Sequence, residues 1–528
     1  MVVEAEVVPA AYVDDLLEML ARGEIVSRDG VLRAKAALCK KYGLSRVPTN
    51  YELLEQVPDD LRTAVAPLLR NKPVRTISGV APVAVMTSPF DCPHGRCSYC
   101  PGGVTNDSPQ SYTGREPAAL RAAMYEYDPF RQTSARLKQL AAIGHRTDKV
   151  DLIVMGGTFT ARPWEYQEWF VKRCFDAMNS QESQDLQTSH VANESAPSRC
   201  VGLTVETRPD WFLDEHVASS MSLGATKVEL GAQILDDDVL DGVKRGHHVK
   251  DIADATARAR EAGLKVCYHI MPGLPGSSAE NDLRSFSLMF QDERFRPDML
   301  KIYPTLVIKG TELYDWWRAG DYTPMSLEET TALVVEMKKR APSWVRILRV
   351  QRDIPVQLIE AGVRKSHLRE LASWELKRAG NRCACVRCRE VGHMGVRRDA
   401  VESEDVRFSE VSYRASGGTE FFFSYSTAMS DCLVGYARLR CADDPSKHPA
   451  RVRELHVYGE MAPIDESPAG AWQHKGFGES LLTHCEDKAA SLGFSTVSVT
   501  SGVGARNYYR RLGYGLTDLY MSKALGRA

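Results

Sequence analysis

Residues Phe90–Gly103 read FDCPHGRCSYCPGG and place three cysteines, Cys92, Cys97 and Cys100, in one short run. The apolar run Val83–Met86 ends just before this stretch, so the cysteines are expected in a loop that leaves a β-strand. Their spacing is Cys-x4-Cys-x2-Cys, followed at once by Pro-Gly-Gly. Because cysteines this close in sequence are typical of metal–thiolate sites, we expect the fold to be organised around a bound metal or cluster.

Three thiolates can hold three irons of a 4Fe–4S cluster and leave the fourth iron open for another ligand. In radical enzymes, S-adenosylmethionine binds and is split at that open iron. The commoner spacing in such enzymes is Cys-x3-Cys-x2-Cys; here the first gap is one residue longer, but the Cys-Ser-Tyr-Cys end is retained. The alternative is a zinc site that takes its fourth ligand elsewhere, and His94 is close by in sequence.

The composition is that of a large globular chain. Its 528 residues are enough for about two to four domains, and its formal net charge of −2 indicates neither a nucleic acid nor a membrane partner for the chain as a whole. No apolar run is long enough to cross a membrane, and Glu4 and Glu6 stand where a signal peptide would be basic. Six of the 13 cysteines fall in two tight clusters, which indicates metal binding and a reducing cytoplasm.

From about residue 80 to 305, apolar runs alternate with helical stretches. Repeated strand–helix units form a parallel sheet, so six of them predict an α/β fold, a partial (β/α)6 barrel with its chemistry at the carboxyl ends of the strands. The polar stretch Asn179–Arg199 breaks this rhythm and is expected to be a mobile surface insertion. The expected strands are Val83–Met86, Val150–Met155, Cys200–Val205, Lys227–Leu230, Leu264–Ile270 and Met299–Tyr303.

Glycines or polar residues that could bind a cofactor follow these strands. Gly156 and Gly157 let the backbone approach a ligand, and a carbonyl there can hold the ammonium of S-adenosylmethionine; an ordinary turn is the alternative. Glu206 and Arg208 suit the cofactor's hydroxyls and carboxylate, although a salt bridge at the barrel rim explains them equally well. Gln233 is a third polar group on the same rim.

The C-terminal region changes character and predicts a separate α+β domain, with strands first and then a helix at Gly476–Ser491. The motif Gln-x-x-Gly-x-Gly at 473–478 opens that helix, where backbone N–H groups can bind a pyrophosphate. The strand at Glu454–Tyr458 precedes it and Tyr508 and Tyr509 follow, an order that resembles the GNAT acetyltransferase fold. In that fold a tyrosine lies by the thioester sulfur; packing of either tyrosine in the core is the alternative.

A basic segment joins the two regions. From Lys338 to Arg398 there are sixteen Lys or Arg against five Asp or Glu, an excess that favours a polyanionic partner over a merely solvated helix face. Lys149, just before the second strand, is either a rim charge or a ligand for an acyl group that reaches into the barrel.

The same segment carries the second cysteine cluster. Three cysteines and a histidine make a closed tetrahedral zinc set, which would hold the segment between the domains. A second iron–sulfur cluster is the alternative, and Cys267 or Cys174 could replace the histidine as fourth ligand. The expected zinc ligands are Cys383, Cys385, Cys388 and His393.

Taken together, these motifs resemble the Elongator catalytic-subunit family of tRNA wobble-uridine modifying enzymes, in its stand-alone bacterial or archaeal form. The resemblance runs from about residue 45 to the end of the sequence. It is carried by Val47–Asn50, Cys97–Gly103, Val154–Phe159, Val205–Asp210, Lys301–Val307, Arg349–Pro355, Arg389–Gly392 and Glu454–Gly459.

The resemblance implies four parts: a tRNA-contacting helical segment at 1–75, a radical S-adenosylmethionine (SAM) barrel at 76–345, a basic zinc-binding linker at 346–400 and a GNAT domain at 401–528. It implies an acyltransferase that uses the 4Fe–4S cluster, S-adenosylmethionine and acetyl-CoA to place a carboxymethyl group on C5 of uridine 34. The implied partners are the tRNA anticodon stem-loop, an electron-donor protein and a second copy of the chain.

The resemblance also implies site residues in the GNAT region. Lys149, Tyr508 and Tyr509 are the implied catalytic residues, and Gly476 belongs to the phosphate-binding loop. A protein lysine N-acetyltransferase with a structural cluster is the rival function; a general base near Glu454 would favour it, and the basic segment argues against it. The residues implied to contact acetyl-CoA are Lys149, Glu454, Leu455, His456, Val457, Phe477, Gly478, Glu479 and Tyr509.

Overall fold

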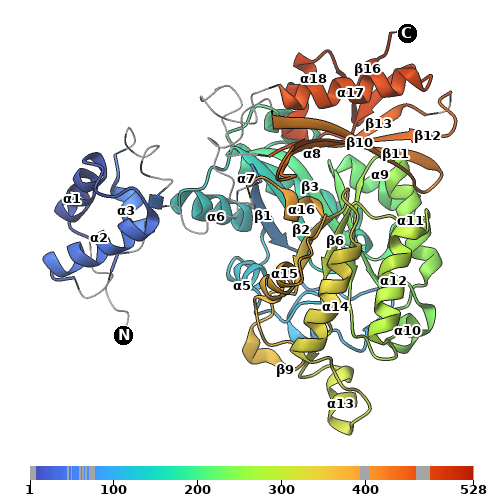
Figure 1. Cartoon of the computed structure of the whole chain (residues 1–528), viewed down its shortest axis with the longest axis horizontal. Coiled ribbons are helices and arrows are strands. Elements are labelled where there is room, and N and C mark those ends of the chain that lie inside the picture. The colour runs from blue at the N-terminus through green and yellow to red at the C-terminus, as the bar shows by residue number, and fades with distance from the viewer. Residues whose placement is uncertain are drawn as a thin grey trace.

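The computed structural model describes residues 8–44, 47–48, 50–58, 61, 65, 68–69, 76, 78–392, 405–446, 448–458 and 476–526. At the N-terminal end, helices α1 (Ala10–Ala21), α2 (Arg28–Lys41) and α3 (Asn50–Gln56) form a small lobe beside the main body (Figure 1). The lobe has an apolar core of its own that includes Tyr12 and Leu53. None of the described helices is long and apolar enough to cross a membrane.

Among residues 78–392, parallel strands form one sheet in the order β1-β2-β3-β4-β5-β6-β8. The partial barrel and its six expected strands are therefore confirmed. The strands are β1 (Ala81–Met86), β2 (Lys149–Met155), β3 (Arg199–Thr207), β4 (Lys227–Gln233), β5 (Lys265–Ile270), β6 (Met299–Ile302) and β8 (Arg346–Val350).

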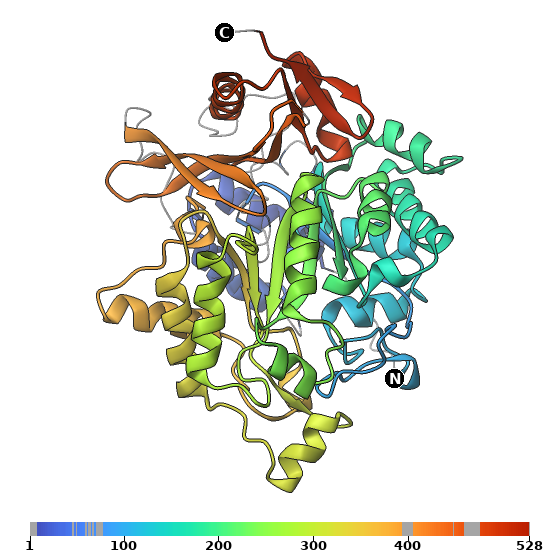
Figure 2. The same cartoon turned by 90° about the vertical axis from the view of Figure 1, so that its right-hand side faces the viewer.

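Amphipathic helices cover the outside of this sheet and leave its inner face, the barrel lumen, to the strands (Figures 1 and 2). Val150, Leu152 and Val154 alternate on the buried outer face of β2 and pack against Phe170 and Phe175 of α7. The helices are α5 (Pro117–Met124), α6 (Pro129–Ala142), α7 (Trp164–Asn179), α9 (Asp214–Ser222), α10 (Asp237–Gly242), α11 (Val249–Glu261), α12 (Ala279–Gln291) and α14 (Leu327–Arg340). Helix α13 (Glu312–Ala319) instead projects from the lower end of the body in Figure 1.

The basic segment contributes directly to the barrel. Strand β8 pairs in parallel with β6 and adds a seventh strand to the six expected from the sequence. After it in the chain come β9 (Ile359–Ala361), α15 (Leu368–Arg378) and α16 (Val386–Arg389). Strand β9 pairs in antiparallel fashion with β7 (Val307–Ile308), which precedes the basic segment.

The prediction of a mobile insertion at Asn179–Arg199 is wrong. Helix α8 (Leu186–Asn193) occupies it, capped by the side chain of Asp185. Its polar residues Ser189, His190 and Asn193 are buried. Asn193 Nδ2 donates to Asn179 Oδ1 at 2.7 Å, and Asn193 Oδ1 accepts from the backbone N–H of Cys200 at 2.7 Å. A stretch that reads as solvated in sequence is thus fixed through buried hydrogen bonds.

The C-terminal domain is a second sheet, in the order β10-β11-β12-β13-β14-β16-β15, with α17 (Phe477–Ser491) and α18 (Arg506–Arg511) packed on it. Strands β10 to β13 are antiparallel, whereas β13 and β14 pair in parallel. The expected α+β domain is confirmed, and β15 and β16 add an edge hairpin to it. The strands are β10 (Val406–Arg414), β11 (Gly418–Thr427), β12 (Leu433–Ala442), β13 (Ala450–Val457), β14 (Thr496–Val499), β15 (Gly515–Thr517) and β16 (Tyr520–Ala524).

This domain caps the end of the barrel at which the parallel strands begin (Figures 1 and 2). A buried ion cluster joins the two parts: Arg453 of β13 donates to Asp298, which directly precedes β6, and to Glu420 of β11. Arg260 of α11 pairs with Glu420 as well. The interface is therefore held by charges that are shared between the domains and removed from water.

Two candidate active sites at opposite ends of the barrel

The cysteine loop lies at the carboxyl ends of the strands, among hydrogen-bond donors. Cys97 Sγ lies 3.2 Å from His94 Nε2 and 3.6 Å from Arg245 Nη1, and Cys100 Sγ accepts from the backbone N–H of Ser111 at 3.3 Å. Burial raises the pKa of the Cys100 thiol, and the neighbouring thiol of Cys97 raises it further. Donors that point at sulfur stabilise thiolates, the form in which cysteine binds metal.

The glycine turn after β2 is required by close packing. Gly156 has φ of +133°, and a Cβ there would lie 2.1 Å from Thr87 Oγ1 at the end of β1. Gly157 follows with φ of +94° and faces Gln110. Because they lack side chains, the two glycines let the turn pack closely against β1 and the cysteine loop, at the edge of a cavity.

A cavity of about 130 Å³ opens at this end and is lined by Cys92, Gly157, Glu206, Arg208 and Gln233, all predicted from the sequence. Glu206 accepts from Tyr112 Oη at 2.8 Å. Arg208 donates two hydrogen bonds to the carboxylate of Asp210, at 2.9 and 2.7 Å, and one to the carbonyl of Arg245. The guanidinium therefore has protein partners, so its expected contact with a cofactor carboxylate stays a prediction.

Sequence reasoning missed the charged residues of the barrel lumen. Glu229 is almost fully buried; its Oε2 contacts Lys301 Nζ and lies 2.8 Å from His269 Nε2. Lys227 lies 3.6 Å from the other carboxylate oxygen, and Lys301 lies 3.6 Å from Glu206. A signal existed, because charged and apolar residues alternate along β4, β5 and β6 with the period of a strand whose inner face is polar.

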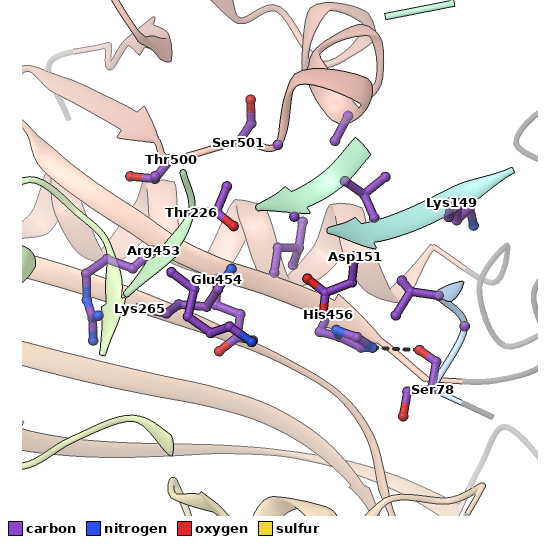
Figure 3. Close-up of a pocket in the computed structure, with 18 of the residues that line it drawn as sticks. Ser78, Lys149, Asp151, Thr226, Lys265, Arg453, Glu454, His456, Thr500 and Ser501 are labelled. Atoms are coloured by element: carbon purple, nitrogen blue, oxygen red, sulfur yellow. Dashed lines mark hydrogen bonds between the residues drawn. The ribbon is translucent and has the colours of Figure 1, made fainter. Parts of the chain in front are cut away.

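A second cavity of about 400 Å³ lies at the opposite end of the strands, between the barrel and the C-terminal domain (Figure 3). Lys149, Tyr509 and the β13 residues Glu454–Val457 all line it, and their expected contact with acetyl-CoA stays a prediction. Pairing of β13 with β14 covers only Ala450–Val452, so β13 runs on past the end of β14 and opens the notch that the cavity fills.

Two titratable side chains of β13 are already bonded in this cavity. Glu454 Oε2 accepts from Arg438 Nε at 2.8 Å, and His456 Nε2 lies 2.9 Å from the carbonyl oxygen of Ser78. Burial raises the pKa of Glu454, but the charges of Arg438 and Lys265 and the hydrogen bond from Arg438 together lower it, and the net shift is downward. Burial lowers the pKa of His456 and that of Lys149.

Helix α17 begins beside this cavity. Gly476 is its N-cap, with φ of +78°. A Cβ on Gly478 would lie 2.9 Å from Tyr508 Oη and 3.6 Å from Val457, so the helix start, α18 and β13 meet. Tyr509 lines the cavity and Tyr508 stands next to it; burial raises the pKa of Tyr508 to about 12. Gln473 of the predicted loop lies outside the described residues.

Comparison with known proteins identifies the chain's relatives. Residues 87–286 match the radical SAM superfamily, 297–378 the radical SAM C-terminal domain, 10–77 the ELP3 N-terminal domain and 393–514 the acetyltransferase (GNAT) family. The tRNA uridine(34) acetyltransferase of Methanocaldococcus jannaschii is 44% identical over 526 residues, 97% of each chain. The chain belongs to the Elp3 family. It is accordingly an enzyme of the acyltransferase class.

More distant and structural relatives agree with membership of the Elp3 family. Elongator complex protein 3 of Homo sapiens is 40% identical and covers 97% of this chain and 96% of its own. The solved structure of Methanocaldococcus infernus Elp3, which lacks its N-terminus, is 43% identical and matches with a TM-score of 0.75. It covers 85% of this chain and 100% of its own. The expected family and fold class are thereby confirmed.

The cavity at the carboxyl ends of the strands fits the cofactors that radical SAM domains imply, a 4Fe–4S cluster and S-adenosylmethionine. Among the described residues, four side chains that line this cavity carry buried polar atoms without a hydrogen-bond partner: Tyr99 Oη, Glu229 Oε1, Gln233 Oε1 and Arg245 Nε. Buried polar groups are rarely left unpaired in a complete site. A polar ligand beside Cys92, Cys97 and Cys100 would supply their partners.

The second cysteine group of this Elp3-family chain is gathered as predicted. The Sγ atoms of Cys383, Cys385 and Cys388 all lie within 4.8 Å of one another, and Lys338 Nζ lies 3.8 Å from Cys388 Sγ. His393 lies outside the described residues, so its role as fourth ligand stays a prediction. Cys267 groups instead with Glu229 and His269 in the lumen, which contradicts its alternative role as the fourth ligand.

Proposed function

We propose that the protein modifies the wobble uridine of tRNA, using a radical SAM cluster and acetyl-CoA to form a carboxymethyl group on C5 of uridine 34. Relatives at 44–45% identity carry the name tRNA uridine(34) acetyltransferase. The observation that carries the proposal is that one sheet joins two cavities, one at each end of its strands. Lys149, at the start of β2, lines one cavity, and Met155, on the same face at its end, lines the other. At the usual rise per residue of a strand, these two residues lie about 20 Å apart.

The two cavities divide the work between them. With its cofactors bound, the cysteine-loop cavity would supply a 5′-deoxyadenosyl radical able to remove hydrogen from an acetyl methyl group. Glu206, held by Tyr112, and Gln233 would orient the cofactor, and Arg245 would hold Cys97 as a thiolate. At the other end, the open edge of β13 would pair with the amides of the pantetheine arm, and the start of α17 would bind the pyrophosphate.

A groove rich in arginine supports an RNA substrate. A cavity of about 560 Å³ is lined by Arg115, Arg369 and Arg387, and it shares Arg349 and Arg352 with the cysteine-loop cavity. Arginines bind phosphates and position a nucleic acid without reading its sequence. A splayed single-stranded base could enter along this groove, as RNA-modifying enzymes require. The groove belongs to the segment in which the sequence predicted a polyanion site.

The Cys383, Cys385 and Cys388 group would hold zinc and fix the arginine-rich segment against β8. The backbone N–H of Val386 donates to the carbonyl of Val345 at 2.8 Å, so the group sits directly beside the barrel sheet. A closed thiolate set has a structural role rather than a catalytic one. An electron-donor protein and a second copy of the chain complete the proposed partners, with the cytoplasm as the proposed location.

The rival function, lysine acetylation of proteins, has weaker support. Glu454 itself is a poor candidate for the general base that this function needs, because its carboxylate is bonded to Arg438. A carboxylate neutralised by a guanidinium is a poor acceptor for the proton of an amine. The arginine groove would also be without a role in an enzyme that acts on proteins.

The test is anaerobic incubation of the reconstituted protein with tRNA, S-adenosylmethionine and acetyl-CoA labelled in its methyl group, followed by digestion to nucleosides. Label in a C5-carboxymethyl uridine is expected with wild type and with the control variant Cys39→Ser, whose thiol lies in the N-terminal lobe. Cys97→Ala should yield no labelled nucleoside. Label on protein lysines alone, or an unaffected product in Cys97→Ala, would overturn the proposal.

A further inference from the structure

The acyl end of the 400 Å³ cavity contains a carboxylate that neither the sequence reasoning nor the proposed roles use. Asp151 lies two residues after Lys149 on β2, so both side chains project from the same face of the strand. Both line the cavity, and Figure 3 shows Asp151 next to the β13 residue His456, with Lys149 farther along β2. Lys149 is the residue expected to meet the acyl group, which places Asp151 near the same group.

The surroundings of Asp151 leave its carboxylate accessible from the cavity. Its neighbour across the sheet is Gly202 of β3, and a Cβ on Gly202 would lie 3.0 Å from Asp151 Oδ1. The glycine therefore clears the space in front of the carboxylate. Within the described part of the chain, the Asp151 side chain forms no hydrogen bond or ion pair, although Glu454 in the same cavity is bonded to Arg438.

Cations from three strands face Asp151, but none of them forms an ion pair with it within the described residues. They are Lys149 on β2, Lys227 on β4 and Lys265 on β5, and all three line the cavity. Burial lowers the pKa of Lys227, but the nearby carboxylates of Asp151 and Glu229 raise it, and the net shift is upward. The charged or titratable groups of β13 that line the cavity are Arg453, Glu454 and His456, all bonded to other partners. Asp151 is thus the carboxylate in this cavity placed to accept a proton.

We propose that Asp151 is the general base that activates water to cleave the acyl-CoA thioester in this cavity. This inference rests on the proposed use of acetyl-CoA. Water attacks the thioester carbonyl carbon while the Asp151 carboxylate takes one of its protons. The Lys149 ammonium stabilises the oxyanion that forms. The carbon–sulfur bond then breaks, the proton on Asp151 passes to the departing sulfur, and the products are the carboxylic acid and free CoA thiol.

The test measures thiol release from acetyl-CoA by the full-length protein, in the presence of tRNA and without the radical cofactors. Asp151→Asn keeps the size of the side chain and removes the base, so the rate at saturating acetyl-CoA should fall about 100-fold or more. Affinity for a non-hydrolysable thioether analogue, measured by calorimetry, should change less than about threefold. Asp254→Asn, on the exposed surface of α11, is the matched control.

Two further measurements separate catalysis from a structural role. The acidic limb of the pH–rate profile should vanish in Asp151→Asn, and formate should restore part of the rate to Asp151→Ala, because an added carboxylate can replace the missing base. An unchanged rate in Asp151→Asn overturns the inference. So does a loss confined to affinity or to folding, with no rescue by formate.

Failure of the proposed function gives a different result. If wild type releases no thiol and binds no acyl-CoA analogue, the use of acetyl-CoA is itself wrong, and the inference falls with it. If wild type releases thiol and Asp151→Asn does so equally, the role of Asp151 alone is wrong. Release of thiol by wild type that requires Asp151 supports both.

Discussion

Arg453 donates a hydrogen bond to each carboxylate oxygen of Asp298, at 2.8 and 2.7 Å, and both side chains are 0% exposed. The pair joins the acetyltransferase domain to the barrel, directly before Glu454 of the acyl cavity. Asp298 Oδ2 also accepts from the backbone N–H of Val266 at 2.8 Å. One carboxylate therefore orients both β13, which carries the acyl site, and β5, which carries Val266.

Replacing Asp298 with alanine should destabilise the protein by about 3–5 kcal/mol, because the guanidinium of Arg453 would remain buried without a full set of acceptors. Urea unfolding followed by fluorescence would measure the loss. Asp443→Ala removes the acidic partner of Arg414 in an exposed pair and should cost no more than about 1 kcal/mol. Equal losses in the two variants would contradict a central role for the buried cluster.

The same cluster predicts loss of stability in acid. Burial raises the pKa of Asp298, but the charges of Arg453 and Arg260 dominate and hold it well below its usual range. A carboxyl group whose pKa is lower in the folded state contributes stability that is complete above its unfolded pKa, about 4, and is lost as pH falls below that. Urea midpoints measured from pH 7 to pH 3 should therefore drop steeply below about pH 4. The slope should be shallower in Asp298→Asn, and an identical slope would contradict the assignment.

We expect Glu194, which lies just after α8 in the barrel domain, to affect the affinity of the acyl-CoA site. Its carboxylate contacts Arg506, at 3.3 Å, and Arg510, and its carbonyl accepts from Asn507, so it fixes the helix that carries Tyr509. Glu194→Ala leaves the buried Arg506 short of an acceptor, a loss of about 1–3 kcal/mol.

Calorimetry with a non-hydrolysable acyl-CoA should show at least about a fivefold loss of affinity in Glu194→Ala. The control Glu182→Ala lies in the same segment but is exposed, and it should bind as wild type does. Affinity that is unchanged in both variants would show that α8 has no influence on the acyl site.

The role of this segment explains where sequence reasoning succeeded and failed. Apolar runs predicted the strands correctly, because burial of one face of a sheet imposes a hydrophobic pattern that can be recognised in the sequence alone. The pattern failed at α8, where Asn179 and Asn193 are buried as polar groups that bond to each other. Their partners come from tertiary folding and leave no local signal.

The site residues divide in the same way. Glycines and cysteines beside strand ends could be predicted because their spacing reports local geometry. Asp151 and Glu229 could have been noticed from the polar alternation along their strands, but the Glu229 partners His269 and Lys301 lie on other strands. Which charge meets which depends on sheet register, and the sequence alone does not specify that register.

Gly156→Ala should damage the cysteine-loop cavity selectively. The new methyl group would lie 2.1 Å from Thr87 Oγ1, in a backbone conformation that residues other than glycine rarely adopt. S-adenosylmethionine affinity of the reconstituted protein should fall at least about tenfold, whereas acyl-CoA affinity at the far end of the barrel should not change. The double variant Thr87→Ala with Gly156→Ala should recover only part of the loss, because the backbone strain remains. Normal S-adenosylmethionine binding in Gly156→Ala would contradict this description of the turn.

Cys385→Ser tests the proposed zinc site. The substitution removes one of three gathered thiols from the segment that packs against β8, so the zinc content should fall by about one equivalent per chain. Because structural zinc contributes directly to folding, the thermal midpoint should fall as well, and added zinc should not restore it. The control Cys39→Ser, in the N-terminal lobe, should retain both the metal and the midpoint.

Binding of tRNA should weaken together with the loss of zinc, because the arginine groove includes Arg387, which lies between Cys385 and Cys388. Zinc that stays at the wild-type level in Cys385→Ser, or iron in its place, would rule out the zinc assignment and favour a second iron–sulfur cluster.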